Sequence, residues 1–244
     1  MKKKSIVIFA VIIAFSGAVH SMDIISWAKI SAGGAGTDSR DAGIKSLIVE
    51  IMKRTNIDID PEIRLVQVNP ALFSFPFVTL SYNSDLRFTA LEIKILRDYL
   101  LAGGTIFIDN PGGVRGNVFD LAVRREFNKI FSGVSFEAIP ISDVIYKSFY
   151  LIKFVSGRVI AQPYLDGIRV GGRYAVIYSL NDIFGACAKS SDGGGGWEFD
   201  VVPGGEGQRE HAIRLAVNII MYVLTLDYKE DMVHKPFILR RESK

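Results

Sequence analysis

Short polar side chains follow two apolar runs of the sequence, residues 105–108 and 174–178, and they have the chemistry to bind a ligand. Apolar runs of this length are typical of buried strands in a parallel sheet. The carboxyl ends of such strands share one edge, where open α/β sheets bind their ligands. The sequence therefore predicts one ligand-binding crevice. Its side chains are Asp109, Asn110, Ser179, Asn181 and Asp182.

The charges of these residues indicate a class of ligand. Two of the five are carboxylates, so the crevice is expected to favour cationic or polyhydroxylated ligands over phosphates, unless a basic group intervenes. Asn and Asp side chains after a strand also fix turns by bonding to nearby backbone. A purely structural role for the cluster is therefore the alternative interpretation.

A glycine-rich loop, residues 33–36, follows the first predicted strand. It has neither the glycine spacing of a dinucleotide-binding fingerprint nor the Lys-Ser/Thr end of a P-loop. The pattern favours an ordinary strand-to-helix turn. As a ligand-facing loop it would place Gly33 and Gly34 at the floor or rim of the crevice, because backbone donors at a helix start attract anions.

The sequence shows no catalytic or metal-binding constellation. Its single cysteine, Cys187, is not in a glycine-flanked strand-turn-helix elbow, and a cysteine nucleophile needs an aligned base and oxyanion donors. The three histidines have no metal-ligand spacing with it. We therefore predict no catalytic residues, no metal and no cofactor. The histidines are His20, His211 and His234.

The elements around these residues alternate between strands and helices. Thr89 and Glu92 fit a capping box at the start of one helix, which ends at the Gly103–Gly104 pair. The pattern predicts an α/β fold with a single open, mostly parallel sheet and helices on both faces. Strands are predicted at 24–30, 63–68, 77–81, 105–109 and 174–178, and helices at 40–55, 89–101, 117–131 and 206–224.

The amino terminus has the form of a signal peptide. Lys2, Lys3 and Lys4 precede a short apolar run and then small residues. We predict a signal peptide at 1–21, followed by one α/β domain at 22–244 with a short C-terminal tail. An uncleaved membrane anchor is the alternative. Removing residues 1–21 removes three of the positive charges and leaves no net charge, so nothing in the charge indicates a nucleic-acid partner.

Four blocks of the sequence resemble the domain-of-unknown-function 4159 family. They come in the order of the family, and the resemblance spans nearly the whole mature chain, from about residue 25 to 241. They are 96–109 (LRDYLLAGGTIFID), 178–185 (YSLNDIFG), 214–225 (RLAVNIIMYVLT) and 233–241 (VHKPFILRR). The resemblance implies a flavodoxin-like sheet, similar to class I glutamine amidotransferases but without their catalytic triad. His211 is not followed by an acid two residues later, unlike the amidotransferase His-x-Glu pair. Many relatives have Asp-His where this chain has Ser142-Asp143.

The same resemblance implies an exported bacterial protein, periplasmic or tethered to the inner membrane by an uncleaved anchor. Its expected partners are envelope proteins of a system with von Willebrand A-type proteins and MoxR-type ATPases. The function expected from these features is a non-catalytic binding or interaction module of the cell envelope. The alternative is a hydrolase or transferase of amidotransferase-like ancestry that acts on an envelope saccharide or peptide.

The signal peptide predicts a mature protein that begins near Met22, because the small residues before it fit a cleavage site. Amino-terminal sequencing of the protein from a periplasmic fraction checks this. An intact Met1 in the membrane fraction would instead support the anchor.

Overall fold

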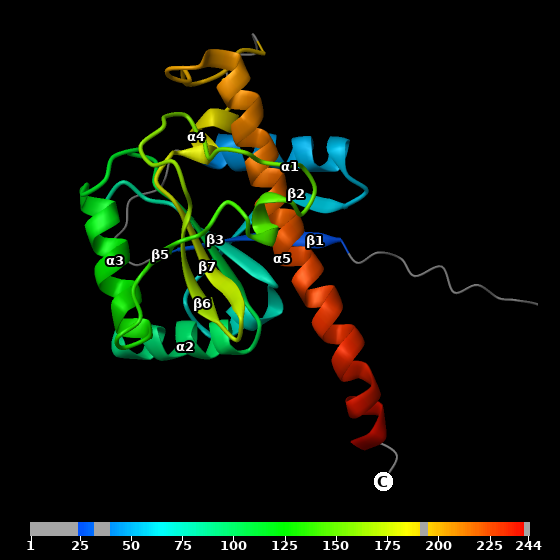
Figure 1. Cartoon of the computed structure of the whole chain (residues 1–244). Coiled ribbons are helices and arrows are strands. Elements are labelled where there is room, and N and C mark those ends of the chain that lie inside the picture. The colour runs from blue at the N-terminus through cyan, green and yellow to red at the C-terminus, as the bar shows by residue number, and fades with distance from the viewer. Residues whose placement is uncertain (1–23, 32–39, 191–194, 242–244) are drawn as a thin grey trace, which may run out of the picture.

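The computed structural model describes residues 24–31, 40–190 and 195–241. Its centre is one seven-stranded sheet with the strand order β2-β1-β3-β4-β7-β6-β5 (Figure 1). The fold is therefore the predicted open α/β sheet. The strands are β1 (Ile25–Ile30), β2 (Ile59–Val66), β3 (Phe77–Leu80), β4 (Thr105–Asp109), β5 (Glu137–Ala138), β6 (Asp166–Val170) and β7 (Arg173–Ser179).

Most of the sheet is parallel, and its antiparallel part is a hairpin. β2, β1, β3, β4 and β7 pair in parallel, whereas β6 is antiparallel to both β7 and β5. Gly171 and Gly172 connect β6 to β7, with φ angles of 59° and 87°. A two-residue hairpin turn of this kind needs positive φ at both positions, which glycine adopts without a steric penalty.

Helices cover both faces of the sheet. α1 (Asp41–Arg54), α4 (Ile183–Cys187) and α5 (Gly205–Arg241) contact one another on one face, and α2 (Ala90–Leu101) contacts α3 (Val118–Ile130) on the other. Figure 1 shows α5 crossing the sheet and continuing past it. Two short 3₁₀ helices complete the elements, η1 (Pro70–Ser74) and η2 (Val144–Tyr146).

The alternation of side chains along each strand divides the core into two layers. Trp27 and Phe77 pack in the layer under α1 and α5, whereas Val78 and Ile106 pack in the layer under α2 and α3. The connection from β1 through α1 to β2 leads toward one edge of the sheet, whereas the connection from β3 through α2 to β4 leads toward the other edge. The winding direction therefore reverses between β1 and β3, which is the position where sheets of this type bind ligands.

Most predicted elements are confirmed, with differences at their ends. The capping box forms, since Thr89 accepts from the backbone of Glu92 and the Glu92 side chain accepts from Thr89 in return. β2 starts four residues before the predicted strand, and α5 continues past residue 224 to Arg241. β5 and β6 were not predicted. Among the described residues, no helix has both the length and the apolar character needed to cross a membrane.

Gly43 is where α1 packs against α4. A Cβ atom at this position would lie 2.0 Å from the carbonyl oxygen of Phe184, so Gly43→Ala forces the helices apart. We expect the variant to lose about 1–3 kcal/mol of unfolding free energy in urea denaturation. Gly207→Ala is the control, because a Cβ there meets no atom within 4 Å. A Gly43→Ala protein as stable as this control would contradict the packing.

Candidate functional site

The predicted polar residues lie together at the carboxyl edge of the sheet. Asp109 ends β4 and pairs in register with Ser179, which ends β7. The backbone N–H of Asn110 also donates to the carbonyl of Ser179 at 2.9 Å. The side chains of all five residues are fully buried. Their burial requires partners for every polar group, and these partners determine what the cluster can do.

Asp109 faces the start of α4. Its two carboxylate oxygens accept the backbone N–H groups of Ile183 at 2.9 Å and Phe184 at 2.8 Å. Burial and, to a smaller extent, the negative charge of Asp182 raise the pKa of this carboxyl to about 7, although the N–H donors and the Ser179 hydroxyl oppose both effects. A carboxyl group with this pKa is able to give or accept a proton near neutral pH.

Asp182 binds two arginines. Arg40 donates to its carboxylate through two nitrogens, at 2.8 and 2.7 Å, and Arg158 donates to it through Nε. Its backbone is left-handed, with φ 55°, and its side chain caps α4 by accepting from Gly185 N at 3.0 Å. Asp is one of the few residues other than glycine that tolerates this conformation. The carboxylate therefore connects the starts of α1 and α4 to the loop that contains Arg158.

The two asparagines face away from the carboxylates. Asn181 holds the backbone of Gln162, accepting its N–H at 2.9 Å and donating to its carbonyl at 2.7 Å. Asn110 binds Asn117, at the start of α3, and the hydroxyl of Tyr178 at 3.2 Å. Each asparagine thus fixes a loop through its side chain, as the structural interpretation of the cluster expects.

The structure therefore brings Asp109, Ser179 and Asp182 together, and it directs Asn110 and Asn181 to neighbouring loops. Gly33 and Gly34 lie outside the described residues. The sequence did not identify Arg40 and Arg158 as part of this cluster. They are the basic groups whose presence would weaken the expected preference for a cationic ligand. Arg158 lies in the stretch 136–161, where no element was predicted, and Arg40 looked like an ordinary first residue of a helix. No local signal pairs either one with Asp182.

Cys187 has no access to solvent. It lies in α4 with its thiol buried, and burial, together with the nearby charge of Asp109, raises its pKa far above the usual range. A thiol of this kind is not a nucleophile. Within the described part of the chain, no group of three or more His, Cys, Asp or Glu residues is placed to hold a metal ion.

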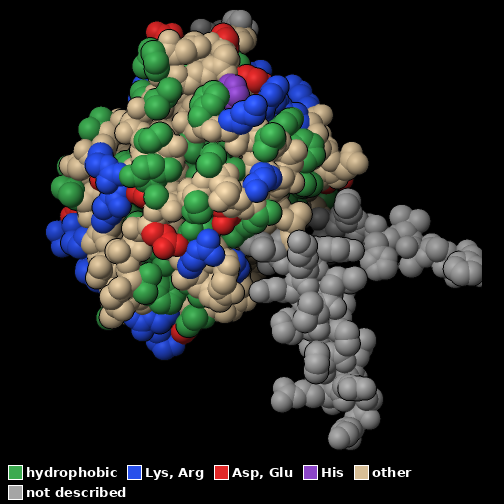
Figure 2. All heavy atoms as spheres, in the orientation of Figure 1, with side chains coloured by type: hydrophobic (Ala, Val, Ile, Leu, Met, Phe, Trp, Pro, Cys, Tyr) green, Lys and Arg blue, Asp and Glu red, His purple; other side chains and the backbone are tan. Residues whose placement is uncertain are grey.

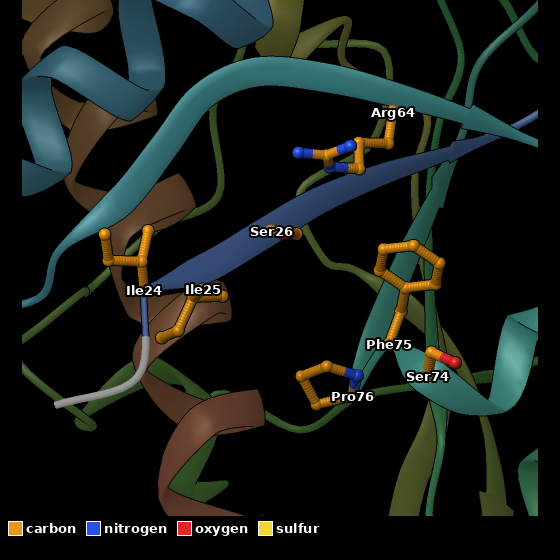
Figure 3. A pocket seen from close by; sticks show the side chains of 7 residues that line it. All are labelled: Ile24, Ile25, Ser26, Arg64, Ser74, Phe75 and Pro76. Carbon is orange, nitrogen blue, oxygen red and sulfur yellow. The ribbon is translucent and has the colours of Figure 1, made fainter.

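An open pocket of about 440 Å³ lies near the opposite edge of the sheet, at the amino ends of β1 and β3. Figure 3 shows Arg64 of β2 on one side of it and Phe75 and Pro76 on the other. Arg64 is paired with Asp60 at 2.9 Å. The pocket is separate from the polar cluster at the carboxyl edge. Its lining residues are Ile24, Ile25, Ser26, Arg64, Ser74, Phe75 and Pro76.

A family profile matches most of the chain. The sequence profile of a family described as "Domain of unknown function (DUF4159)" matches residues 26–224. It covers the blocks at 96–109 and 178–185, and the block at 214–225 except for its last residue, and it ends before the block at 233–241. No curated protein matches the chain.

The raised pKa of Asp109 predicts a loss of stability as the pH rises from about 4 to about 7. The unfolded chain releases this proton near pH 4, whereas the folded protein keeps it to about pH 7. The folded state therefore binds more protons across this window, and the free energy of unfolding falls. The wild type should lose up to about 1.4 kcal/mol per pH unit relative to Asp109→Asn.

Urea unfolding of both proteins at pH 4, 5, 6 and 7 measures this difference. Other titrating groups act in both proteins, so they cancel when the two curves are subtracted. A difference that stays constant from pH 4 to 7 would show that Asp109 has an ordinary pKa.

Proposed function

Since this chain belongs to the DUF4159 family, whose description assigns no activity, we propose its function from its own surfaces: it is a non-catalytic interaction module of the bacterial cell envelope. The observation that carries the proposal is a strip of exposed apolar side chains along α5. The strip consists of Phe149, Leu151 and Phe154, with exposed fractions of 43%, 71% and 45%.

The segment that carries the strip is held firmly on α5. Asn218 accepts the backbone N–H of Tyr150 at 2.7 Å and donates to its carbonyl at 2.8 Å. The Ser148 hydroxyl donates to the carbonyl of Asn218 at 2.6 Å. A side-chain amide that bonds both backbone groups of one residue fixes that residue as a neighbouring strand would. The exposed side chains therefore project from a rigid backbone.

Aromatic contacts fix the side chains as well. The rings of Phe149 and Tyr150 meet edge to face at 4.8 Å, and the ring of Phe154 lies 4.3 Å from that of His211 on α5. Rigid aromatic side chains lose little entropy when a partner binds, which is why they are common at the centres of protein interfaces. Contiguous apolar surface on a folded domain is typical of such interfaces.

The charge beside the strip indicates its partner. Lys147, just before the strip, and Lys153, between Leu151 and Phe154, are both exposed, and no ion pair of either lysine occurs among the described residues. Figure 2 shows the face that α5 crosses, where apolar side chains lie among basic and acidic ones. We infer a protein partner that presents apolar side chains between acidic ones. An envelope protein of the von Willebrand A-type and MoxR system is the candidate.

The cluster at the carboxyl edge supports a non-catalytic role. Its two asparagines hold loops, its carboxylate Asp182 holds two arginines, and the thiol of Cys187 is buried. The competing proposal, a hydrolase or transferase that acts on an envelope saccharide or peptide, needs some of these groups free for a substrate. Their internal bonds argue against it.

Photo-crosslinking in the native cell tests the interaction. A photoreactive residue in place of Leu151 should give a discrete adduct with an envelope protein. The same residue at Leu91, which is 66% exposed on α2 on the opposite side of the sheet, should give none. Equal labelling from both positions, or none from Leu151, would contradict the proposal.

A charge reversal tests the expected partner chemistry. Lys153→Glu should reduce the adduct from position 151 several-fold, because it places an acid against acidic partner groups. Lys94→Glu, an exposed position on α2, is the control and should leave the yield unchanged. A hydrolytic or transferase activity that disappears on replacing one residue of the polar cluster would instead support the enzyme.

A further inference from the structure

The open pocket at the amino ends of β1 and β3 belongs neither to the polar cluster nor to the strip on α5. Its volume of about 440 Å³ is in the range of small-molecule sites. Most of its lining is apolar, and Arg64 is its one charged lining residue. Figure 3 shows the start of β1 on one side of the pocket and the residues before β3, Ser74 to Pro76, on the other.

The pocket forms because β1 and β3 separate toward their amino ends. β1 pairs with β2 from Ile25 onward, but with β3 only at Ala28 and Lys29. Successive residues of a parallel strand bond to opposite neighbours. Ile25 donates to the carbonyl of Asp58 on the β2 side at 3.0 Å, so the peptide groups of Ser26 face the β3 side, before the β1–β3 ladder begins. The gap therefore offers a backbone donor and acceptor beside its apolar walls.

The helices on this face of the sheet lie to one side of the pocket. Arg64 pairs in register with Ala28, which packs in the layer under α2 and α3, so the Arg64 side chain is on that face. The main contacts of α2 are with α3, β4 and η1 rather than with β1 or β2. The side chain of Arg64 is 49% exposed and Ile24 is 68% exposed. A ligand can therefore reach the pocket from solvent.

The charge of the pocket comes from Arg64. Its Nη2 donates to Asp60 at 2.9 Å, and this is its one hydrogen bond in the described part of the chain. An exposed ion pair of this kind contributes little stability, so it competes weakly with a ligand. A guanidinium matches the oxygens of a carboxylate. One cation among apolar walls suits a single negative charge on an apolar body, because a phosphate would bring more charge than one arginine offsets.

The residues before Ile24 lie outside the described part of the chain. In a mature protein that begins near Met22, two of them remain, Met22 and Asp23. Two residues are too few to fill a pocket of this size. Most of its volume is then left for a ligand from outside the chain.

We propose that this pocket binds a carboxylate with an apolar body, the chemistry shared by a fatty acid and by the carboxyl-terminal residue of a peptide. Arg64 receives the carboxylate, and Phe75 and Pro76 pack on the apolar body. The site goes beyond the interaction strip on α5 and is independent of it.

An NMR titration of the exported protein tests the site with octanoate and with N-acetyl-leucine, and the tighter of the two identifies the source. The backbone N–H signals of Ser26 and Phe75 should move on binding, whereas that of Tyr150, in the strip, should not. Octanamide, which has the same hydrocarbon chain without the charge, should bind about five- to tenfold more weakly than octanoate, the effect of losing a partly exposed charged contact.

Two exposed positions test the charge with little risk to the fold. Arg64→Gln should weaken octanoate about five- to tenfold and leave octanamide unchanged. Ser74→Asp, which adds an acid at the pocket, should act in the same direction. Arg87→Gln is the control, an exposed arginine that is paired with Asp85 beyond the other end of β3, and it should bind as the wild type does. Thermal melting at the wild-type temperature confirms that each variant is folded.

Several results would overturn the proposal. They are equal affinity for octanoate and octanamide, wild-type octanoate affinity in folded Arg64→Gln, and signals that move in the strip instead of the pocket. Absence of binding by both carboxylates, as would occur if the chain's own first residues fill the pocket, would overturn it too. Crosslinking from position 151 should be the same in Arg64→Gln as in the wild type, so this proposal and the proposed function fail separately.

Discussion

The carboxylate of Asp182 is the group on which the carboxyl edge depends. It binds Arg40 from the start of α1 and Arg158 from the loop beyond η2, and it caps α4. Buried charges of this kind contribute little net stability when paired, but removing one partner typically costs about 3–5 kcal/mol, because the remaining charge is left in a low-dielectric interior. Three segments far apart in the sequence are therefore fixed relative to one another by one side chain.

The charge of Asp182 also affects the pKa of the neighbouring carboxyl group, that of Asp109. Burial raises the pKa of Asp109, and the negative charge of Asp182 raises it further, against the effect of the backbone N–H groups of α4 that donate to its oxygens. The buried cluster therefore holds the loops through its hydrogen bonds, and it also contains a carboxyl group that titrates near neutral pH. Structural and ligand-binding roles of the cluster are thus not exclusive, because the side chain of Arg158, one of the two arginines that hold Asp182, is partly exposed.

The elements of the fold were predictable where side-chain period and capping agree. The apolar runs of β4 and β7 and the capping box before α2 each carry a local signal, and each forms. The hairpin of β6 and β7 also had a signal, the Gly171–Gly172 pair, but β6 itself has a polar first residue and an arginine, so its period is weak. The loop with Arg158 has no period at all, because side chains such as Asn181 and Gln208 hold it rather than a backbone ladder.

The candidate site was predictable only in part, for a related reason. Strand ends place Asp109 and Asp182 at one edge, and topology alone is enough to predict this. Topology does not predict the net charge at that edge. This charge depends on pairs such as Arg40 and Asp182, which are 142 positions apart in the chain. Counting carboxylates near strand ends predicts a cationic ligand, whereas the two arginines paired with Asp182 and the raised pKa of Asp109 remove the negative charge on which that prediction depends. The charge of a buried site is a tertiary property, and a sequence shows it only when the partners are also local.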